Sequence, residues 1–235
     1  MLPPVSTALG WVQDGQQRLE QAVARLPTSA VAEPSALDGW SRGHVLAHLS
    51  RNADALVNLL SWARSGARTP MYDSPEQRNA DIEAGAGRLL AEQQADLRAS
   101  ARRFAEKAAM MSDRDWAARV ANAQGAEIPA AHVPWMRVRE VWIHLVDLRL
   151  GVGVEEFPAD LAWTLTQEVA GWMSGKVEVA VELAAPGHGS VRLGSSVPQG
   201  SLSGSPRRLA AWLTGRAGPE LLQTSGKIPK LPPWL

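Results

Sequence analysis

Helical periodicity runs through the first 150 residues of the chain and is interrupted only by short stretches that contain proline and glycine. Ser41 is the expected N-cap of the second helix, and Pro134 suits the first position of the last one. Gly85 and Gly87 predict a break in the third segment, because each glycine costs about 1 kcal/mol in a helix interior. The expected helical segments are 2–26, 41–65, 76–111 and 134–150. Four helices joined by loops predict an antiparallel bundle.

The sequence after Gly151 has a different pattern. A helix from Pro158 to about Ser174 precedes residues 176–183, where valine and leucine alternate with glutamate and alanine, as in a half-buried strand. Further strands are expected at 190–193 and 200–204, and a further helix from Ser205 through Trp212. We therefore expect an α+β fold that is mostly α. A helical bundle domain covers residues 1–152, and a small C-terminal α/β domain with a short sheet covers 153–235.

The composition excludes several classes of function. Among 235 residues, 24 Lys+Arg balance 24 Asp+Glu, so the chain has no basic footprint for nucleic acid and no polybasic membrane patch. No apolar run reaches the about 20 residues that cross a bilayer, and the N-terminus lacks the pattern of a signal peptide. The absence of cysteine excludes disulfides, cysteine-ligated zinc and a catalytic thiol of the protein's own. We expect a cytoplasmic protein that binds neither nucleic acid nor membrane, and its oligomeric state stays open.

The helix expected from Pro134 carries a polar seam on an otherwise apolar surface. At about 100° per residue, Glu140, His144 and Asp147 fall close together on this helix. Polar groups on a buried face cost free energy unless they are paired or ligated. The Glu-x-x-x-His spacing places a carboxylate and an imidazole one turn apart, so both can reach one metal ion. The alternatives are a solvent-facing stripe or a Glu–His ion pair.

The second expected helix supplies another histidine. His48 and Asn52 lie at the edge of its apolar stripe, whereas His44 lies nearer to solvent and is expected to cap the helix or face water. Taken singly, His48 is most simply a histidine at the edge of the apolar stripe whose ring is hydrogen-bonded within the protein. Together with Glu140 and His144 it completes a set of two histidines and one glutamate. Three protein ligands of these types are typical of catalytic rather than structural zinc.

Arg216 follows Trp-Leu-Thr-Gly, just beyond the last expected helix. A guanidinium at this position can reach into a cleft and bind a carboxylate through two parallel hydrogen bonds. The alternative is an ordinary cationic partner of the helix C-terminus, and from the residues alone this second interpretation is favoured.

Three segments resemble the mycothiol-dependent maleylpyruvate isomerases, which belong to a DinB-like zinc-bundle superfamily. In chain order they are DGWSRGHVLAHLSRNAD (38–54), VREVWIHLVDL (138–148) and AAWLTGR (210–216). The resemblance implies an N-terminal DinB-like four-helix bundle that carries zinc, followed by a small α/β domain. It also implies that His48, Glu140 and His144 are the zinc ligands and that Arg216 is the essential catalytic arginine.

The implied activity is the cis–trans isomerisation of maleylpyruvate to fumarylpyruvate in gentisate breakdown, with mycothiol as a cofactor. A carbon–carbon double bond does not rotate freely, so some group must add to it, allow rotation and leave. A thiolate suits this task, and because the chain has no cysteine the thiol must come from outside it. A zinc or other divalent ion would bind that thiol and lower its pKa from about 8.5. Arg216 would then bind a substrate carboxylate or the enolate-like charge. Asn52 and Asp147 are candidates for cofactor contacts or for supporting the metal ligands.

Other functions fit parts of the same pattern. A mycothiol S-transferase that conjugates electrophiles would use the same zinc and thiol with a different pocket. A non-catalytic zinc-binding regulatory module is the alternative from another class, although such modules tend to use cysteine in closed sites. A metal-free helical domain, in which the histidines and the glutamate coincide by chance, is the third alternative. In the enzymatic interpretations, the expected partners are a small-molecule substrate and a low-molecular-weight thiol.

Overall fold

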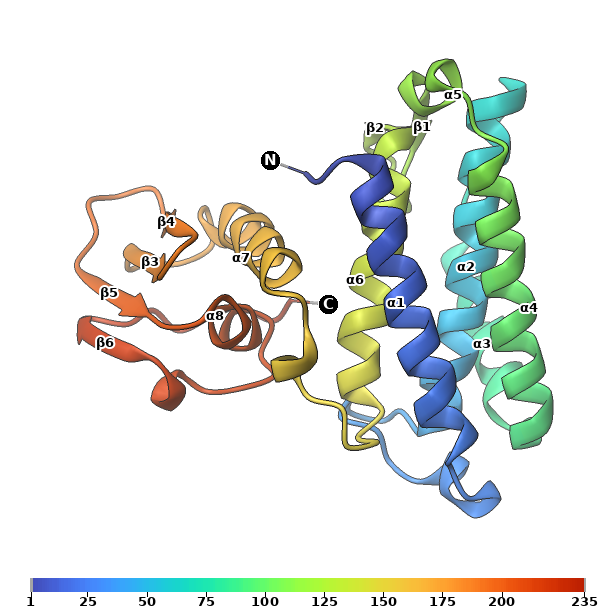
Figure 1. Ribbon diagram of the computed structural model, residues 1–235, viewed down its shortest axis with the longest axis horizontal. Helices are drawn as coiled ribbons and strands as arrows, with labels where there is room; N and C mark the ends of the chain where they lie inside the picture. The colour runs from blue at the N-terminus through green and yellow to red at the C-terminus, as the bar shows by residue number, and fades with distance from the viewer. Residues whose placement is uncertain (1, 235) are drawn as a thin grey trace. The chain divides into compact units, whose positions relative to one another are not determined.

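The computed structural model describes residues 2–234 and divides the chain into two compact units (Figure 1). The first unit spans Pro3–Val152, and the second begins at Gly153. Within the described residues, no helix combines the length and the apolar character that crossing a bilayer requires.

The first unit is a four-helix bundle with a short helical and hairpin insertion (Figure 1). Its long helices form a closed ring, since α1 and α2 each pack against both α4 and α6. In chain order the elements are α1 (Val5–Ala24), η1 (Thr28–Ala32), α2 (Arg42–Ser65), α3 (Pro75–Ala86), α4 (Leu90–Ala109), α5 (Asp113–Ala117), β1 (Arg119–Ala121), β2 (Glu127–Pro129), η2 (Ala130–His132) and α6 (Val133–Asp147). The β1–β2 hairpin, in which Val120 lies opposite Ile128, was not predicted from the sequence.

Local chemistry sets the start of α2 as predicted. The hydroxyl of Ser41 accepts a hydrogen bond from the backbone N–H of His44, and the His44 ring accepts one from the Ser41 N–H, which completes a capping box. Arg42 then donates from Nε to the carbonyl of Leu148 at 2.8 Å. This bond ties the beginning of α2 to the end of α6, so the two helices run antiparallel.

The predicted break in the third helical segment separates α3 from α4 at Gly87. Gly85 allows α3 to approach α2 closely, because a Cβ atom at Gly85 would lie 2.7 Å from the Cβ of Ala47. Any larger residue at this position would push the helices apart. The close approach matters for the site, because it brings α3 next to the turn of α2 that carries His48.

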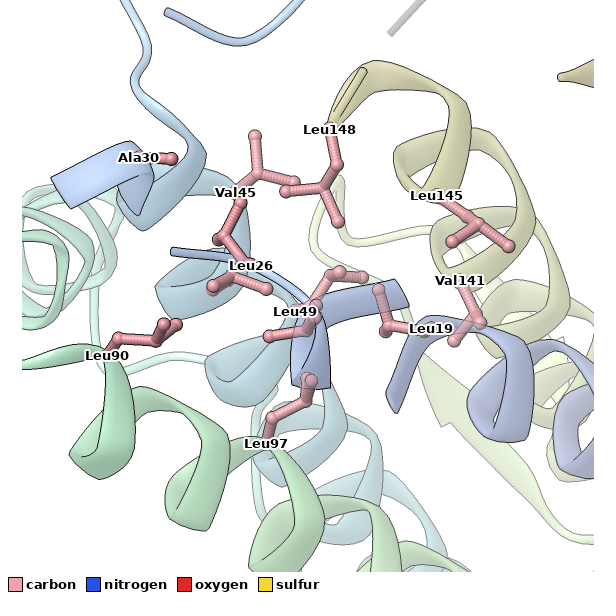
Figure 2. Packing of buried hydrophobic residues seen from close by; sticks show 12 residues of the cluster. Leu19, Leu26, Ala30, Val45, Leu49, Leu90, Leu97, Val141, Leu145 and Leu148 are labelled. Atoms are coloured by element: carbon pink, nitrogen blue, oxygen red, sulfur yellow. The ribbon is translucent and has the colours of Figure 1, made fainter. Parts of the chain in front are cut away.

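A leucine- and valine-rich core fixes α2 against α6 (Figure 2). Leu49 of α2 and Leu145 of α6 are both completely buried in it. Truncating a buried leucine to alanine typically costs about 2–5 kcal/mol, so this register is strongly specified. His48 precedes Leu49 and His144 precedes Leu145. The packing that buries the two leucines therefore also fixes the positions of the two histidines along the bundle axis.

The second unit combines two main helices with a four-stranded sheet (Figure 1). Its strand order is β4-β3-β5-β6, with β3 antiparallel to β4 and parallel to β5. The elements are η3 (Val154–Glu156), α7 (Ala159–Met173), β3 (Val181–Ala185), β4 (Gly189–Leu193), β5 (Gly200–Ser203), α8 (Pro206–Leu213), η4 (Pro219–Leu221) and β6 (Gln223–Gly226).

The predicted fold class, mostly α with a small sheet, is confirmed. One strand is shorter than expected, because β3 begins at Val181 rather than near residue 176. Its partner β4 ends at Leu193, and the following Gly194 has a φ of 99°, so residues 176–180 have no neighbouring strand in that hairpin. The alternation of Val177 and Val179 therefore does not continue the strand.

Candidate metal centre

Three predicted ligands meet inside the bundle. His48 comes from α2, while Glu140 and His144 lie one turn apart on α6. One potential ligand atom of each residue lies within 4.8 Å of the other two. Glu140 Oε2 lies 2.8 Å from His48 Nε2 and 3.3 Å from His144 Nε2, so both imidazoles turn the same nitrogen toward one oxygen.

The centre is largely removed from water. His48 is 5% exposed and His144 is 6% exposed, whereas the Glu140 side chain retains 17% exposure. Burial lowers the pKa of His48 despite the opposing charge of Glu140. Burial alone would raise the pKa of Glu140, but the two histidines hold it well below its usual range. The carboxylate is thus ionised and His48 neutral, which are the forms that bind a metal.

Asp147 orients His144 from the side opposite Glu140. Its Oδ2 atom lies 2.9 Å from His144 Nδ1. Burial opposes a charged imidazole, but hydrogen bonds with Asp147 and Glu140 raise the pKa of His144 overall. A carboxylate on the outer nitrogen of a histidine is the usual partner of a metal-bound imidazole. Asp147 therefore holds the His144 ring by its Nδ1 atom, and its role in supporting a metal ligand stays a prediction.

Further residues around His48 were not singled out by the sequence analysis. The Trp40 ring lies 5.6 Å from the His48 ring and stacks on His44 at 6.1 Å. Arg78 of α3 places Nη2 3.3 Å from His48 Nδ1 and lies over the ring of Tyr72 at 5.7 Å. No local sequence signal marks Arg78 or Tyr72, because the packing of α3 and its preceding loop on α2 brings them to the site.

Asn52 lies one turn beyond His48 on α2 and accepts a hydrogen bond from a buried arginine. Its Oδ1 atom accepts a hydrogen bond of 3.0 Å from Arg137, which also donates to the carbonyl of Leu49 at 2.7 Å. Arg137 is 1% exposed, and burial lowers its pKa to about 10. Arg137 is itself a charged residue on an otherwise apolar helix, three positions before Glu140, and this position could have identified it from the sequence.

A cavity of about 270 Å³ opens beside the centre between α2, α3 and the loop that joins them. Arg78 and Tyr72, which already contact the surroundings of His48, line it together with Met71 and polar side chains. None of the three candidate ligands lines this cavity, and Arg78 connects it to the centre through its contact with His48.

Arg216 lies in the second unit, just beyond the end of α8. Its Nη1 atom donates to the backbone carbonyl of Thr214 and lies 3.5 Å from the carbonyl oxygen of Trp234. This geometry matches a cationic partner of the helix C-terminus. A catalytic role for Arg216 stays a prediction.

The donor set fits zinc. Two imidazole nitrogens and one carboxylate are ligands that zinc accepts, and their number is that of catalytic zinc sites. The Asp147–His144 pair supplies the outer support that such sites use. Nitrogen and oxygen ligands also suit other divalent ions, so zinc is a proposal on the basis of ligand chemistry.

Fold and site together define a helical-bundle protein with a buried His-Glu-His centre and a small α+β unit after it. The family model of the mycothiol maleylpyruvate isomerase N-terminal domain matches residues 12–149, and the chain belongs to this family. The resemblance recognised in the three sequence segments is thereby confirmed.

Two solved structures extend the similarity to nearly the whole chain. One is the crystal structure of the mycothiol-dependent maleylpyruvate isomerase, and the other is that of a histidine-to-alanine mutant of this enzyme. Each is 31% identical to this chain, covers 99% of it and 98% of its own chain, and superposes with a TM-score of 0.89. A comparison with curated proteins found no match.

Proposed function

We propose that this protein is an enzyme that isomerises maleylpyruvate to fumarylpyruvate with mycothiol as its thiol cofactor. The observation that carries the proposal is the convergence of His48, Glu140 and His144 on one point inside the domain that the family model matches. Similarity to the solved isomerase across both units supports the same reaction.

His48, Glu140 and His144 would hold the metal. When bound, zinc and mycothiol would together supply a thiolate that is available at neutral pH and able to add to the double bond. The chain has no cysteine with which to supply that nucleophile itself. Its own residues position the ligands instead: Asp147 orients the His144 ring, and Trp40 covers His48.

Arg216 completes the proposal as the group that binds a carboxylate or the charge that develops on the substrate. Its planar guanidinium can make two parallel hydrogen bonds to a carboxylate. Nη1 also donates to the Thr214 carbonyl, and because a guanidinium has five N–H donors, this bond need not break for the group to bind a substrate oxygen.

The test is an absorbance assay of maleylpyruvate with zinc-loaded protein, in the presence and absence of mycothiol. We expect turnover that requires both the thiol and the metal and that is lost in His48→Ala. His188→Ala is the matched control, because His188 belongs to the second unit and contacts Asp160 rather than the centre. Bound zinc without isomerisation would favour a mycothiol S-transferase, to be tested with electrophiles. A protein that binds no metal would refute both assignments.

A further inference from the structure

The two histidines of the centre differ in the group that faces Nδ1, the ring nitrogen that points away from Glu140. His144 Nδ1 faces the carboxylate of Asp147, which accepts hydrogen bonds. His48 Nδ1 lies 3.3 Å from Arg78 Nη2, and a guanidinium can only donate. In this arrangement Nδ1 of His48 is the acceptor, and the ring proton on Nε2 is donated to Glu140 Oε2 at 2.8 Å.

Metal binding through Nε2 is incompatible with that hydrogen bond. A neutral imidazole that ligates through Nε2 carries its proton on Nδ1. Arg78 has no acceptor for this proton, and its positive charge also lies close to an incoming cation. His144 needs no such rearrangement, since Asp147 already accepts from its Nδ1.

Arg78 is well placed to bind an anion once it leaves His48. It is half-buried on α3 and borders the cavity beside the centre. Arg51, which lines the same cavity, is engaged by the carboxylate of Asp96. Arg78 forms no salt bridge among residues 2–234 and donates instead to the side-chain oxygen of Asn79 and to His48.

The other charges around the cavity restrict where an anion can bind. Asp73 and Asp81 line it and are both exposed. Asp54 also lines the cavity, but Arg51 and Arg103 pair with it. Because like charges repel, an anion in this cavity is favoured only where it contacts a cation directly, and Arg78 is the lining cation without a carboxylate partner among residues 2–234.

We propose that Arg78 binds a carboxylate of the substrate next to the metal, and that metal binding at His48 releases the guanidinium for this task. The inference rests on the proposed function, which gives the site a substrate with carboxylate groups. It assigns to α3 a substrate-binding residue in the same unit as the metal ligands.

The kinetic test compares zinc-loaded wild-type protein with Arg78→Gln, Arg78→Lys and the control Arg98→Gln, which changes an exposed arginine of α4. With saturating mycothiol we expect Arg78→Gln to raise KM for maleylpyruvate about 10- to 100-fold, the range of a charge-assisted hydrogen bond, with a smaller effect on kcat. Arg78→Lys should recover part of the loss, and Arg98→Gln should behave as wild type. An unchanged KM in Arg78→Gln would overturn the proposal.

Zinc affinity, measured by competition with a chelator, separates substrate binding from support of the ligand. Because Arg78→Gln removes a positive charge and a competing hydrogen bond, it should bind zinc at least as tightly as wild type. A tenfold loss of zinc affinity would show instead that Arg78 supports His48, and would contradict the proposal.

Calorimetric titration with maleate, a dicarboxylate that needs no thiol to bind, makes the test independent of turnover. We expect the affinity of zinc-loaded Arg78→Gln for maleate to fall by about the same factor as the change in KM, and that of Arg98→Gln to stay unchanged. If the protein lacks isomerase activity but shows this difference, the proposed reaction fails and the anion site stands. Equal maleate affinity in wild type and Arg78→Gln refutes the anion site.

Discussion

The carboxylate of Asp147 lies 2.9 Å from Nδ1 of His144, and only 1% of Asp147 is exposed. Burying a carboxylate costs free energy unless it is paired, and His144 is the partner that the structure gives it. The pairing turns His144 Nε2 toward Glu140, where the His48 ring also points. The buried pair thus explains why His144 presents one particular nitrogen to the centre.

We predict that Asp147→Asn weakens zinc binding about 10- to 100-fold, because the amide removes the charge that supports the ligand without emptying its position. Competition with a chelator measures the affinity. Asp160→Asn is the matched control, since it alters another Asp–His pair, at 3.1 Å, in the second unit. Equal zinc affinity in Asp147→Asn and wild type would show that this carboxylate does not support the centre.

Local patterns explain why much of the fold, and the meeting of His48, Glu140 and His144, could be predicted. Glu140 and His144 share a face through their spacing alone, and Ser41 marks the start of α2 through its own hydrogen bonds. Arg78 could not be predicted in the same way. Its position depends on how closely α3 packs on α2 at Gly85, and this contact has no local signature.

The strands that were missed lack the pattern on which strand prediction depends. All four residues of β6, Gln223–Gly226, are exposed, and the strand lies at the edge of the sheet. An exposed edge strand does not need alternating apolar residues. The hairpin β1–β2 buries only Val120 completely among its strand residues, so it too carries almost no hydrophobic alternation.

Removing the metal should lower the stability of the bundle. A ligand present at a thousand times its Kd adds about 4 kcal/mol to the free energy of unfolding, because it binds only the folded state. We therefore expect zinc to raise Tm in calorimetry and a chelator to reverse the increase. Glu140→Gln should abolish the effect. Glu83→Gln should retain it, since Glu83 pairs with His44 outside the centre. A zinc-induced rise in Tm that persists in Glu140→Gln would place the metal elsewhere.

Tyr72 is the only tyrosine in the chain, so tyrosinate absorbance reports this residue alone. Burial raises the pKa of Tyr72 above 10, although the neighbouring Arg78 opposes the shift. We expect folded protein to titrate above pH 10 and urea-unfolded protein to titrate near 10. Arg78→Gln should raise the folded value further.

The sign of the stability effect follows from the shift of Tyr72. The folded state favours the neutral phenol, so the unfolded chain loses its proton first as the pH increases. The free energy of unfolding is therefore unaffected by this group below about pH 10 and falls between the unfolded and the folded pKa. Identical titration curves for folded and unfolded protein would contradict the buried position of Tyr72.

Arg216→Lys distinguishes the two roles open to Arg216. A lysine keeps the positive charge near the end of α8, so a role limited to the helix C-terminus predicts a change in stability below about 1 kcal/mol and unchanged turnover. A lysine cannot reproduce two parallel hydrogen bonds to a carboxylate. If Arg216 binds the substrate, we expect kcat/KM to fall by about 100-fold or more while zinc content stays at the wild-type level.

Arg208→Lys, at an exposed arginine of α8 that lies 3.4 Å from Glu155, is the control and should retain full activity. Parallel losses of zinc and turnover in Arg216→Lys would assign the arginine to the integrity of the protein and would exclude a direct role with the substrate.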